Sequence, residues 1–144
     1  MDRRHPPKPK KMKGVSFNQS QVRVAESASA HKSDHPIFCL RYLVNGYDLE
    51  KCDKEQAHFF VKKLANMAQL SWTALLLGDH KSGLGFEPLP KDQIKAPLPA
   101  IVTKDITSMQ VIRFKRDYRI IGFRSDDTYR ITHIELDRSA YDHG

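Results

Sequence analysis

The hydrophobic and polar positions of this chain predict strands near its two ends and helices between them. An apolar run of eight residues, IFCLRYLV, contains one arginine and is followed closely by Asn-Gly, which is typical of a central strand that ends in a turn. The last third of the chain is rich in β-branched and aromatic residues, and two short polar separators, Arg116-Asp117 and 125–127, divide it. Separators this short connect antiparallel neighbours. The predicted strands are Ile37–Val44, Met109–Lys115, Tyr118–Arg124 and Thr128–Leu136.

Two helices are predicted after the first strand. Apolar residues recur at helical spacing over Lys54–Leu70, and Asp53 with Gln56 three residues later predicts a capping box at the start of this helix. Ser71 is a second N-cap candidate, and it precedes a short helix over Trp72–Leu77 that stops at a glycine. The order predicts an α+β fold of one strand, two helices and a three-stranded antiparallel meander. The helices should pack on one face of the sheet and leave the other face to solvent or a ligand.

Residues 78–100, between the second helix and the meander, contain three Gly and four Pro and show no periodicity. This composition predicts a long loop, and long loops in compact domains are often functional. His80 and Lys81 at its start are therefore candidates to face a substrate. The favoured alternative is a surface loop that its prolines stiffen and its few apolar side chains hold against the core.

The formal net charge of the 144-residue chain is +7, and most of the excess lies in its N-terminal part. Residues 1–35 hold eight Lys or Arg against three Asp or Glu, and three early prolines oppose a helix there. We therefore expect a basic, disordered tail over residues 1–35 and a single folded domain over residues 36–144. A basic tail suits a polyanionic partner such as nucleic acid, and it equally suits a solvated leader that aids solubility.

The remaining composition indicates a cytoplasmic protein without membrane contact. No apolar run approaches the roughly 20 residues that a membrane-spanning helix needs, and no apolar stretch follows the N-terminal charges as in a secretion signal. Cys39 and Cys52 have no paired-ligand spacing, so we expect free thiols in a reducing compartment. A disulfide or a zinc site built on them is the remote alternative.

Basic residues are concentrated in the predicted meander. We hypothesise that they bind a phosphodiester. Arginine and lysine can stabilise a crowded phosphorane, and histidine or tyrosine can move the protons of RNA cleavage by its own 2′-OH. The bland alternative is that these arginines pair with nearby acidic residues and that His133 is a structural histidine. Alternation along the strand does not fix the register, so whether Arg119 or Arg124 faces a site stays open.

The stretches RFKRDYRIIGF and DRSAYDHG carry a resemblance to the RelE/ParE superfamily of bacterial toxins, as does the element order. In the RelE and YoeB branches this resemblance implies metal-independent cleavage of mRNA on the ribosome and inhibition by a cognate antitoxin protein. It implies phosphate contacts for Arg119 and Arg138, a backbone contact for Lys115, and a proton-transfer role for Tyr141 or His143. The ParE branch shares the fold without cleaving RNA, so fold alone does not give the activity.

The leading hypothesis is a toxin-like, metal-independent endoribonuclease that needs no cofactor and acts on RNA, with ribosome-associated mRNA as the expected substrate. The alternatives are a non-catalytic nucleic-acid-binding or protein-inhibitory module, and a phage or mobile-element accessory protein without a nucleic-acid role. A zinc or magnesium requirement is unsupported by any ligand motif and stays open. The candidate catalytic residues are Arg119, Arg124, Arg138, Tyr141 and His143, and the candidate nucleic-acid-binding residues are Arg113, Lys115, Arg116, Arg130, His133, His80 and Lys81.

Overall fold

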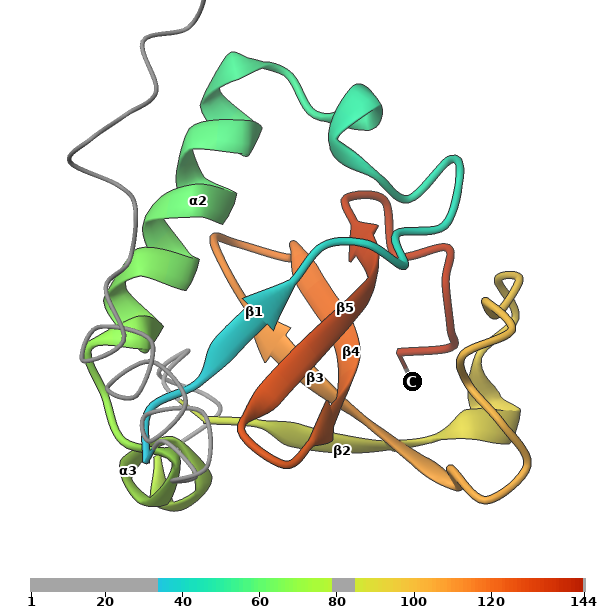
Figure 1. Ribbon diagram of the computed structural model, residues 1–144. Coiled ribbons are helices and arrows are strands. Elements are labelled where there is room, and N and C mark those ends of the chain that lie inside the picture. Colours follow the sequence, from blue (N-terminus) through green and yellow to red (C-terminus); the bar gives the residue numbers. More distant parts are fainter. Residues whose placement is uncertain (1–33, 79–84, 144) are drawn as a thin grey trace, which may run out of the picture. The chain divides into compact units, whose positions relative to one another are not determined.

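Five strands form one open mixed sheet in the order β1-β5-β4-β3-β2, in a computed structural model that describes residues 34–78 and 85–143 (Figure 1). β1 runs parallel to β5, and the other neighbours are antiparallel. The α+β class is confirmed. The main elements in chain order are β1 (Ile37–Cys39), α2 (Lys54–Ala68), α3 (Trp72–Leu77), β2 (Glu87–Pro90), β3 (Ser108–Arg113), β4 (Arg119–Ser125) and β5 (Thr128–Glu135).

Both helices begin where the sequence predicts. The Asp53 carboxylate accepts a hydrogen bond from the backbone N–H of Gln56 at 2.7 Å, and the Gln56 side chain accepts one from the backbone N–H of Asp53 at 2.9 Å. This is the predicted capping box. The Ser71 hydroxyl caps α3 by accepting from the backbone of the third helical residue. Phe60 and Met67 bury the inner side of α2 against one face of the sheet.

The first strand is shorter than predicted and lies at an edge of the sheet, not at its centre. Only Ile37–Cys39 of the predicted range Ile37–Val44 pairs with β5. Beyond it the chain turns away, and Val44 returns to hydrogen-bond the Thr132 carbonyl at 2.8 Å. The edge position leaves the Ile37 side chain 52% exposed, which the compactness of the apolar run did not indicate.

The predicted 78–100 loop contains a strand, so the prediction of one strand plus a three-stranded meander is wrong. β2 pairs antiparallel with β3 and forms the second edge of the sheet. Two of its four residues, Pro88 and Pro90, have no N–H to donate, which restricts such a strand to an edge. The prolines that led us to predict a loop therefore belong to an edge strand, which the sequence pattern did not indicate.

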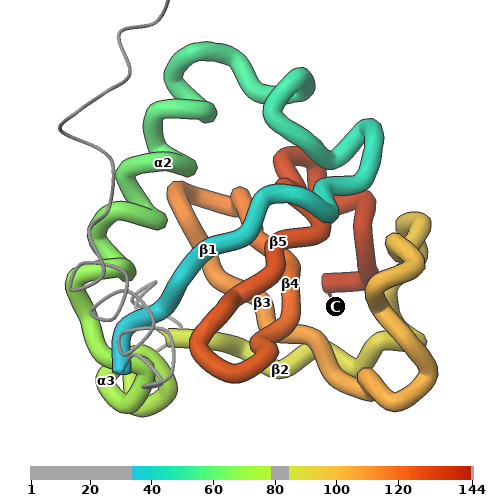
Figure 2. Tube along the Cα trace, viewed as in Figure 1, coloured from blue at the N-terminus to red at the C-terminus, as the bar shows by residue number. Residues whose placement is uncertain are grey.

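The face of the sheet away from α2 is covered, which corrects the prediction of an open face. Apolar side chains of the central strands point to both faces and need covering on both. Figures 1 and 2 show α2 on one side of the sheet, and the chain from β2 to β3 with the C-terminal segment on the other. The buried residues of this second core are Leu89, Ala96, Met109, Val111, Ile121, Phe123 and Ala140.

A β-bulge between β4 and β5 decides which side chains reach the second face. Gly122 lies opposite Ile131, whereas Ile121 lies opposite His133, so Thr132 is an extra residue. Residues of β5 after the bulge therefore point to the opposite face from the one that strict alternation assigns. Strict alternation along β5 therefore assigns the wrong face to residues beyond that point.

Gly122 permits the close backbone approach at the bulge. A Cβ atom at this position would lie 2.3 Å from the Arg130 carbonyl oxygen and 2.9 Å from Cζ of the Tyr129 ring. No side chain fits at these distances without moving backbone. The small residue is therefore required by packing and not by an unusual dihedral angle.

Candidate functional site

Charged side chains from four neighbouring strands meet on the second face of the sheet. Arg113 of β3 lies opposite Arg119 of β4, and Arg119 lies opposite Glu135 of β5. Glu87 of β2 is 4.0 Å from the Arg113 guanidinium. Cross-strand partners share a face of the sheet, so these four residues line one side of it. With Tyr141 and His143 of the C-terminal segment they form the charged cluster.

The two arginines of the charged cluster form an incompletely satisfied cationic pair. Arg119 is 5% exposed, and its terminal nitrogen donates to the backbone carbonyls of Arg116 at 3.5 Å and Tyr118 at 3.3 Å, while its side chain also hydrogen-bonds Tyr141. Within the described part of the chain, the Nε atoms of Arg119 and Arg113 are buried and have no hydrogen-bond partner. Like charges opposite each other on a sheet repel, and buried N–H donors without acceptors are costly. An anion between them would relieve both costs.

Glu135 attaches the C-terminal segment to the charged cluster. Its side chain is fully buried, and Oε2 accepts a hydrogen bond from the backbone N–H of Ala140 at 2.9 Å. Oε1 lies 2.7 Å from Nε2 of His143, a distance that suits an ion pair, although the two groups are not aligned as in a hydrogen bond. One carboxylate thus fixes both the course of the segment and the position of its histidine.

Tyr141 lies near Arg119 and near the carboxylates of Glu135 and Glu87. Its ring stacks on the ring of His143 with centroids 3.9 Å apart and planes at 22°. Burial raises the pKa of Tyr141, the nearby Glu135 and Glu87 carboxylates raise it further, and the charge and hydrogen bonding of Arg119 oppose them. The phenol therefore stays protonated at neutral pH and is able to donate a hydrogen bond.

The structure places Arg119 in the charged cluster and Arg124 away from it. The two residues are five apart on β4 and so point to opposite faces, about 17 Å apart at roughly 3.3 Å per residue. The Arg124 guanidinium lies 4.1 Å from the ring of Trp72, and its Nε donates to the Asp126 carbonyl at 2.6 Å. Arg124 thus lies over an aromatic ring on the helix side of the sheet.

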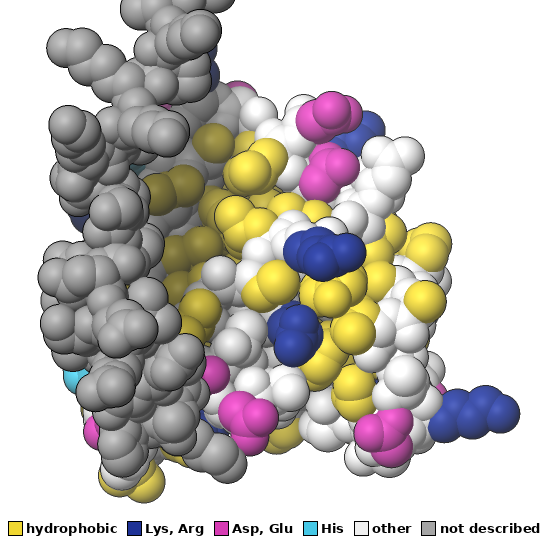
Figure 3. Space-filling model, viewed as in Figure 1, with side chains coloured by type: hydrophobic (Ala, Val, Ile, Leu, Met, Phe, Trp, Pro, Cys, Tyr) yellow, Lys and Arg dark blue, Asp and Glu magenta, His cyan; other side chains and the backbone are white. Residues whose placement is uncertain are grey.

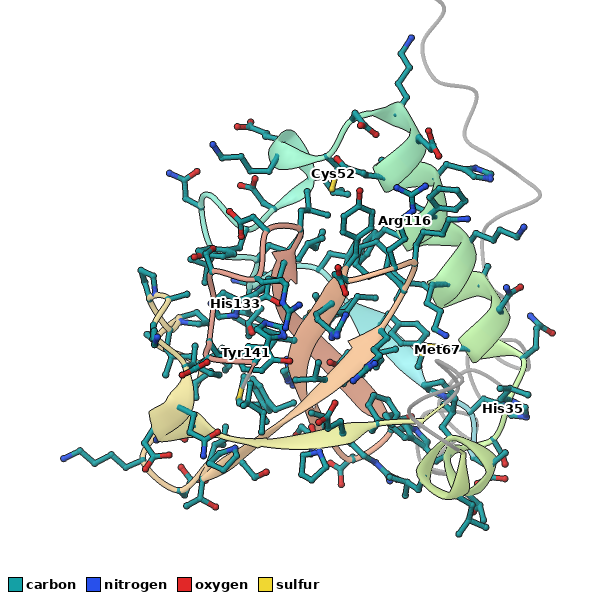
Figure 4. The ribbon with its side chains drawn as sticks, turned by 180° about the vertical axis from the view of Figure 1, so that it is seen from behind. His35, Cys52, Met67, Arg116, His133 and Tyr141 are labelled. Carbon is teal, nitrogen blue, oxygen red and sulfur yellow. The ribbon has the colours of Figure 1, made fainter. Side chains whose placement is uncertain are left out.

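The remaining predicted basic residues lie outside the charged cluster. Lys115 is 4.2 Å from the centre of the Phe59 ring, on the α2 side. Arg116 and Arg138 are exposed and occupy turns with left-handed backbone angles. Arg130 contacts an aromatic ring near the β1 edge. Figure 4 shows Arg116 close to α2, and Tyr141 on the opposite side of the sheet.

His133 is fully buried in the second face and has a partner at each ring nitrogen. Nε2 is 2.8 Å from the Pro97 carbonyl oxygen and Nδ1 is 2.7 Å from the Thr132 hydroxyl. A carbonyl oxygen can only accept, so Nε2 carries the proton and donates to it. Burial lowers the pKa of His133 more than the Pro97 contact raises it. These contacts are those of the structural histidine that the sequence left as an alternative, and Figure 4 shows the ring inside the fold.

Of the two acidic members of the charged cluster, Glu87 was not predicted from the sequence, and Glu135 was considered only among the acidic residues that could pair with the arginines of the sheet. Glu87 lies in the segment that was expected to be a loop, and Glu135 reaches the cluster only because the bulge turns the end of β5 over. The available signal was a lone acidic residue at the end of each otherwise apolar or proline-rich stretch. His80 and Lys81, predicted to face a substrate, lie outside the described residues.

A metal site has no support from side-chain grouping. Among residues 34–78 and 85–143, no three His, Cys, Asp or Glu side chains gather closely enough to hold a metal ion. Cys39 and Cys52 are free thiols. The groups available for chemistry in the charged cluster are therefore two guanidiniums, two carboxylates, one phenol and one imidazole.

The described helices include none that is long and apolar enough to cross a membrane.

Similarity to other proteins adds nothing to this description of the site. No protein-family model matches the chain, and neither a curated protein nor a solved structure is significantly similar to it.

Proposed function

We propose that the charged cluster cleaves RNA without a metal ion, using the 2′-OH of the substrate as the nucleophile. The observation that carries this proposal is the buried Arg119, whose Nε has no partner and which lies beside a phenol, an imidazole and a carboxylate. A buried guanidinium with a free donor suits a phosphate oxygen. The three groups around it are those that move protons in such a reaction.

Glu87 is the proposed general base. Its side chain is 40% exposed and its ion pair with Arg113 is long at 4.0 Å, so a substrate hydroxyl can reach the carboxylate. Glu135 is fully buried and already holds the C-terminal segment, which leaves Glu87 as the available carboxylate. Arg113 and Arg119 would stabilise the charge that develops on the phosphorane oxygens.

His143 is the proposed general acid, because its imidazole stacks on Tyr141 and lies 2.7 Å from the Glu135 carboxylate, beside the proposed phosphate site. In the proposed step the 2′-oxygen attacks phosphorus and its proton passes to Glu87. The P–O5′ bond breaks and the leaving oxygen takes the proton of His143. The products are a 2′,3′-cyclic phosphate and a 5′-hydroxyl end, with no net change in protons. Tyr141, protonated at neutral pH, would donate a hydrogen bond to a non-bridging oxygen.

We also propose that the chain is related to the RelE/ParE superfamily, as its sequence resemblance implies. The observed order of one strand, two helices and then antiparallel strands supports it, as does the position of Tyr141 and His143 beside Arg119. We therefore propose ribosome-associated mRNA as the substrate and a cognate antitoxin as a partner. Free mRNA as the substrate is the simpler form of the same proposal.

The test is cleavage of a defined mRNA by the purified chain in EDTA, with and without programmed ribosomes. We expect cyclic-phosphate ends, and no cleavage at a site where the 2′-OH is replaced by hydrogen. Glu87→Gln and Tyr141→Phe should lower the rate on the order of a hundredfold or more, as expected when a proton-transfer group or an oxyanion donor is removed. Glu55→Gln on α2 removes an exposed carboxylate far from the charged cluster and should have no effect.

Absence of cleavage in both settings by a folded wild-type chain would overturn the proposal. Circular dichroism and a cooperative thermal transition would establish that the chain is folded. Cleavage that Glu87→Gln and Glu55→Gln affect equally would also contradict the assigned roles. A non-catalytic binding or inhibitory module would then be the better account of the same charged cluster.

A further inference from the structure

A second group of basic and aromatic side chains lies near the β1 edge of the sheet. Tyr42 follows β1 and is partly exposed, with the Arg130 guanidinium 5.6 Å and the Arg41 guanidinium 5.9 Å from the centre of its ring. The three residues come from two separate parts of the chain, because Arg130 belongs to β5. Both distances fall in the range of a cation–π contact. These three residues form the Tyr42 platform.

The arginines of the Tyr42 platform keep donors available to a ligand. Arg41 is exposed and Arg130 is partly exposed, and among the described residues neither forms an ion pair with a carboxylate. A guanidinium held against an aromatic ring has fewer orientations to lose on binding, while its edge still presents N–H groups. Figure 3 shows basic side chains among hydrophobic ones in the middle of a face, with acidic side chains toward the margin.

The Tyr42 platform and the charged cluster lie on the same face of the sheet. Arg130 is the cross-strand partner of Phe123, which belongs to the second core. Glu135 reaches that face after the bulge. The two positions are five residues apart on β5, which is about 17 Å at roughly 3.3 Å per residue. An RNA strand with its reacting phosphate at the charged cluster continues for several nucleotides, so its length is sufficient to reach the platform.

We infer that the Tyr42 platform is a second binding site for single-stranded RNA, which holds a nucleotide away from the one that is cleaved. Arg41 and Arg130 contact phosphate oxygens, and their planar guanidiniums offer a stacking surface to a base. Tyr42 keeps both guanidiniums in place. This inference rests on the proposed function for the identity of the polymer and names a site that the reaction itself does not require.

The test measures the binding of 2′-O-methyl oligoribonucleotides, which are not cleaved, by fluorescence anisotropy. A twelve-nucleotide probe and a dinucleotide probe are compared for the wild type, Arg41→Ala, Arg130→Ala and Arg130→Lys. We expect each alanine variant to bind the long probe about three- to tenfold more weakly and the dinucleotide unchanged. The log–log slope of affinity against salt concentration should become shallower by about 0.7 for each phosphate that the variant no longer binds. Arg130→Lys should recover part of the affinity, since it restores charge without the planar fork.

The control is Lys62→Ala, which removes an exposed positive charge from α2 on the other side of the sheet. An equal loss of affinity in this variant would show that only net charge matters and would overturn the inference. Wild-type affinities that do not differ between long and short probes would overturn it as well. So would equal displacement of the long probe by an acidic peptide, which would indicate a protein partner. Arg41 lies outside the strands, so its variant keeps the test valid if the β5 variants fail to fold.

Binding and cleavage fail in different ways in this design. If the platform variants lose affinity for the uncleavable probe and no RNA is cleaved by any variant, the platform stands and the nuclease assignment falls. If the wild type cleaves RNA and the platform variants retain their kcat/KM on long substrates, the nuclease assignment stands and the platform falls. Affinity loss on the long probe, together with a selective loss of kcat/KM on long substrates, supports both.

Discussion

Glu135 should connect the stability of the fold to the order of its C-terminal segment. The carboxylate is fully buried, accepts the Ala140 N–H at 2.9 Å and lies 2.7 Å from the His143 ring. Glu135→Gln keeps an oxygen for the backbone bond and removes the charge. The neutral amide is then a poorer partner for the His143 ring than the carboxylate. The variant should therefore lower the free energy of unfolding by about 1–3 kcal/mol, the cost of one poorly matched buried polar group.

Glu135→Ala should cost more than Glu135→Gln. It leaves the Ala140 N–H without its acceptor, removes the charge opposite Arg119 and opens a small cavity. Breaking a buried charge pair by deleting one partner costs about 3–5 kcal/mol, and we expect a loss in that range. The assay is urea denaturation followed by circular dichroism, with ΔG extrapolated at constant m-value. Glu55→Gln, an exposed carboxylate on α2, should stay within about 0.5 kcal/mol of the wild type.

The same two variants should release the C-terminal segment. Amide hydrogen exchange at Ala140 and Tyr141 should quicken more in Glu135→Ala than in Glu135→Gln, because only the alanine variant loses the backbone bond. A loss below about 1 kcal/mol in Glu135→Ala, with unchanged exchange in the segment, would refute the reasoning. It would mean that the bridge from Ile94 to Tyr141 and the stacked rings hold the segment without the carboxylate.

Three further predictions concern the bulge, the buried histidine and the phenol. Gly122→Ala places a Cβ 2.3 Å from the Arg130 carbonyl and should destabilise the fold by about 1–3 kcal/mol or more, measured by urea denaturation, and an unchanged midpoint would contradict the bulge geometry. Burial lowers the pKa of His133 in the folded chain, whereas an unfolded histidine has a pKa of roughly 6.5, so below that pH the unfolded chain binds more protons than the folded one. The contribution of His133 to the free energy of unfolding should therefore be complete above that pH and decrease as the pH falls below it. The dependence of the free energy of unfolding on pH in this range should be weaker in His133→Gln. Tyr141 has a raised pKa, so the midpoint of its ultraviolet titration should lie above that of free tyrosine. A midpoint at or below the free value would show that the phenol is exposed to solvent and would contradict its position in the charged cluster.

Much of the local structure of this protein was determined by the sequence on its own. The capping box of Asp53 and Gln56 fixed the start of α2, because its contacts lie within four residues. The short polar separators predicted two antiparallel hairpins, and the left-handed angles of Arg116 and Asp126 show the tight turns that such separators make. Arg119, Tyr141 and His143 were named as candidates from residue type and motif. What these cases share is information carried by neighbours in the chain.

Only the tertiary structure decided which of these residues meet. A strand with Pro88 and Pro90 is stable only where its outer edge needs no partner, and its pairing with β3 supplies what its own residues do not favour. The extra residue Thr132 reverses the face of everything after it on β5, and no period-two pattern registers one inserted residue. The pairing of β2 with β3 brings Glu87 to the arginines, and the bulge in β5 brings Glu135 to them. Their contribution to the charged cluster therefore depends on strand register, which is set by packing across the sheet and not by any local pattern.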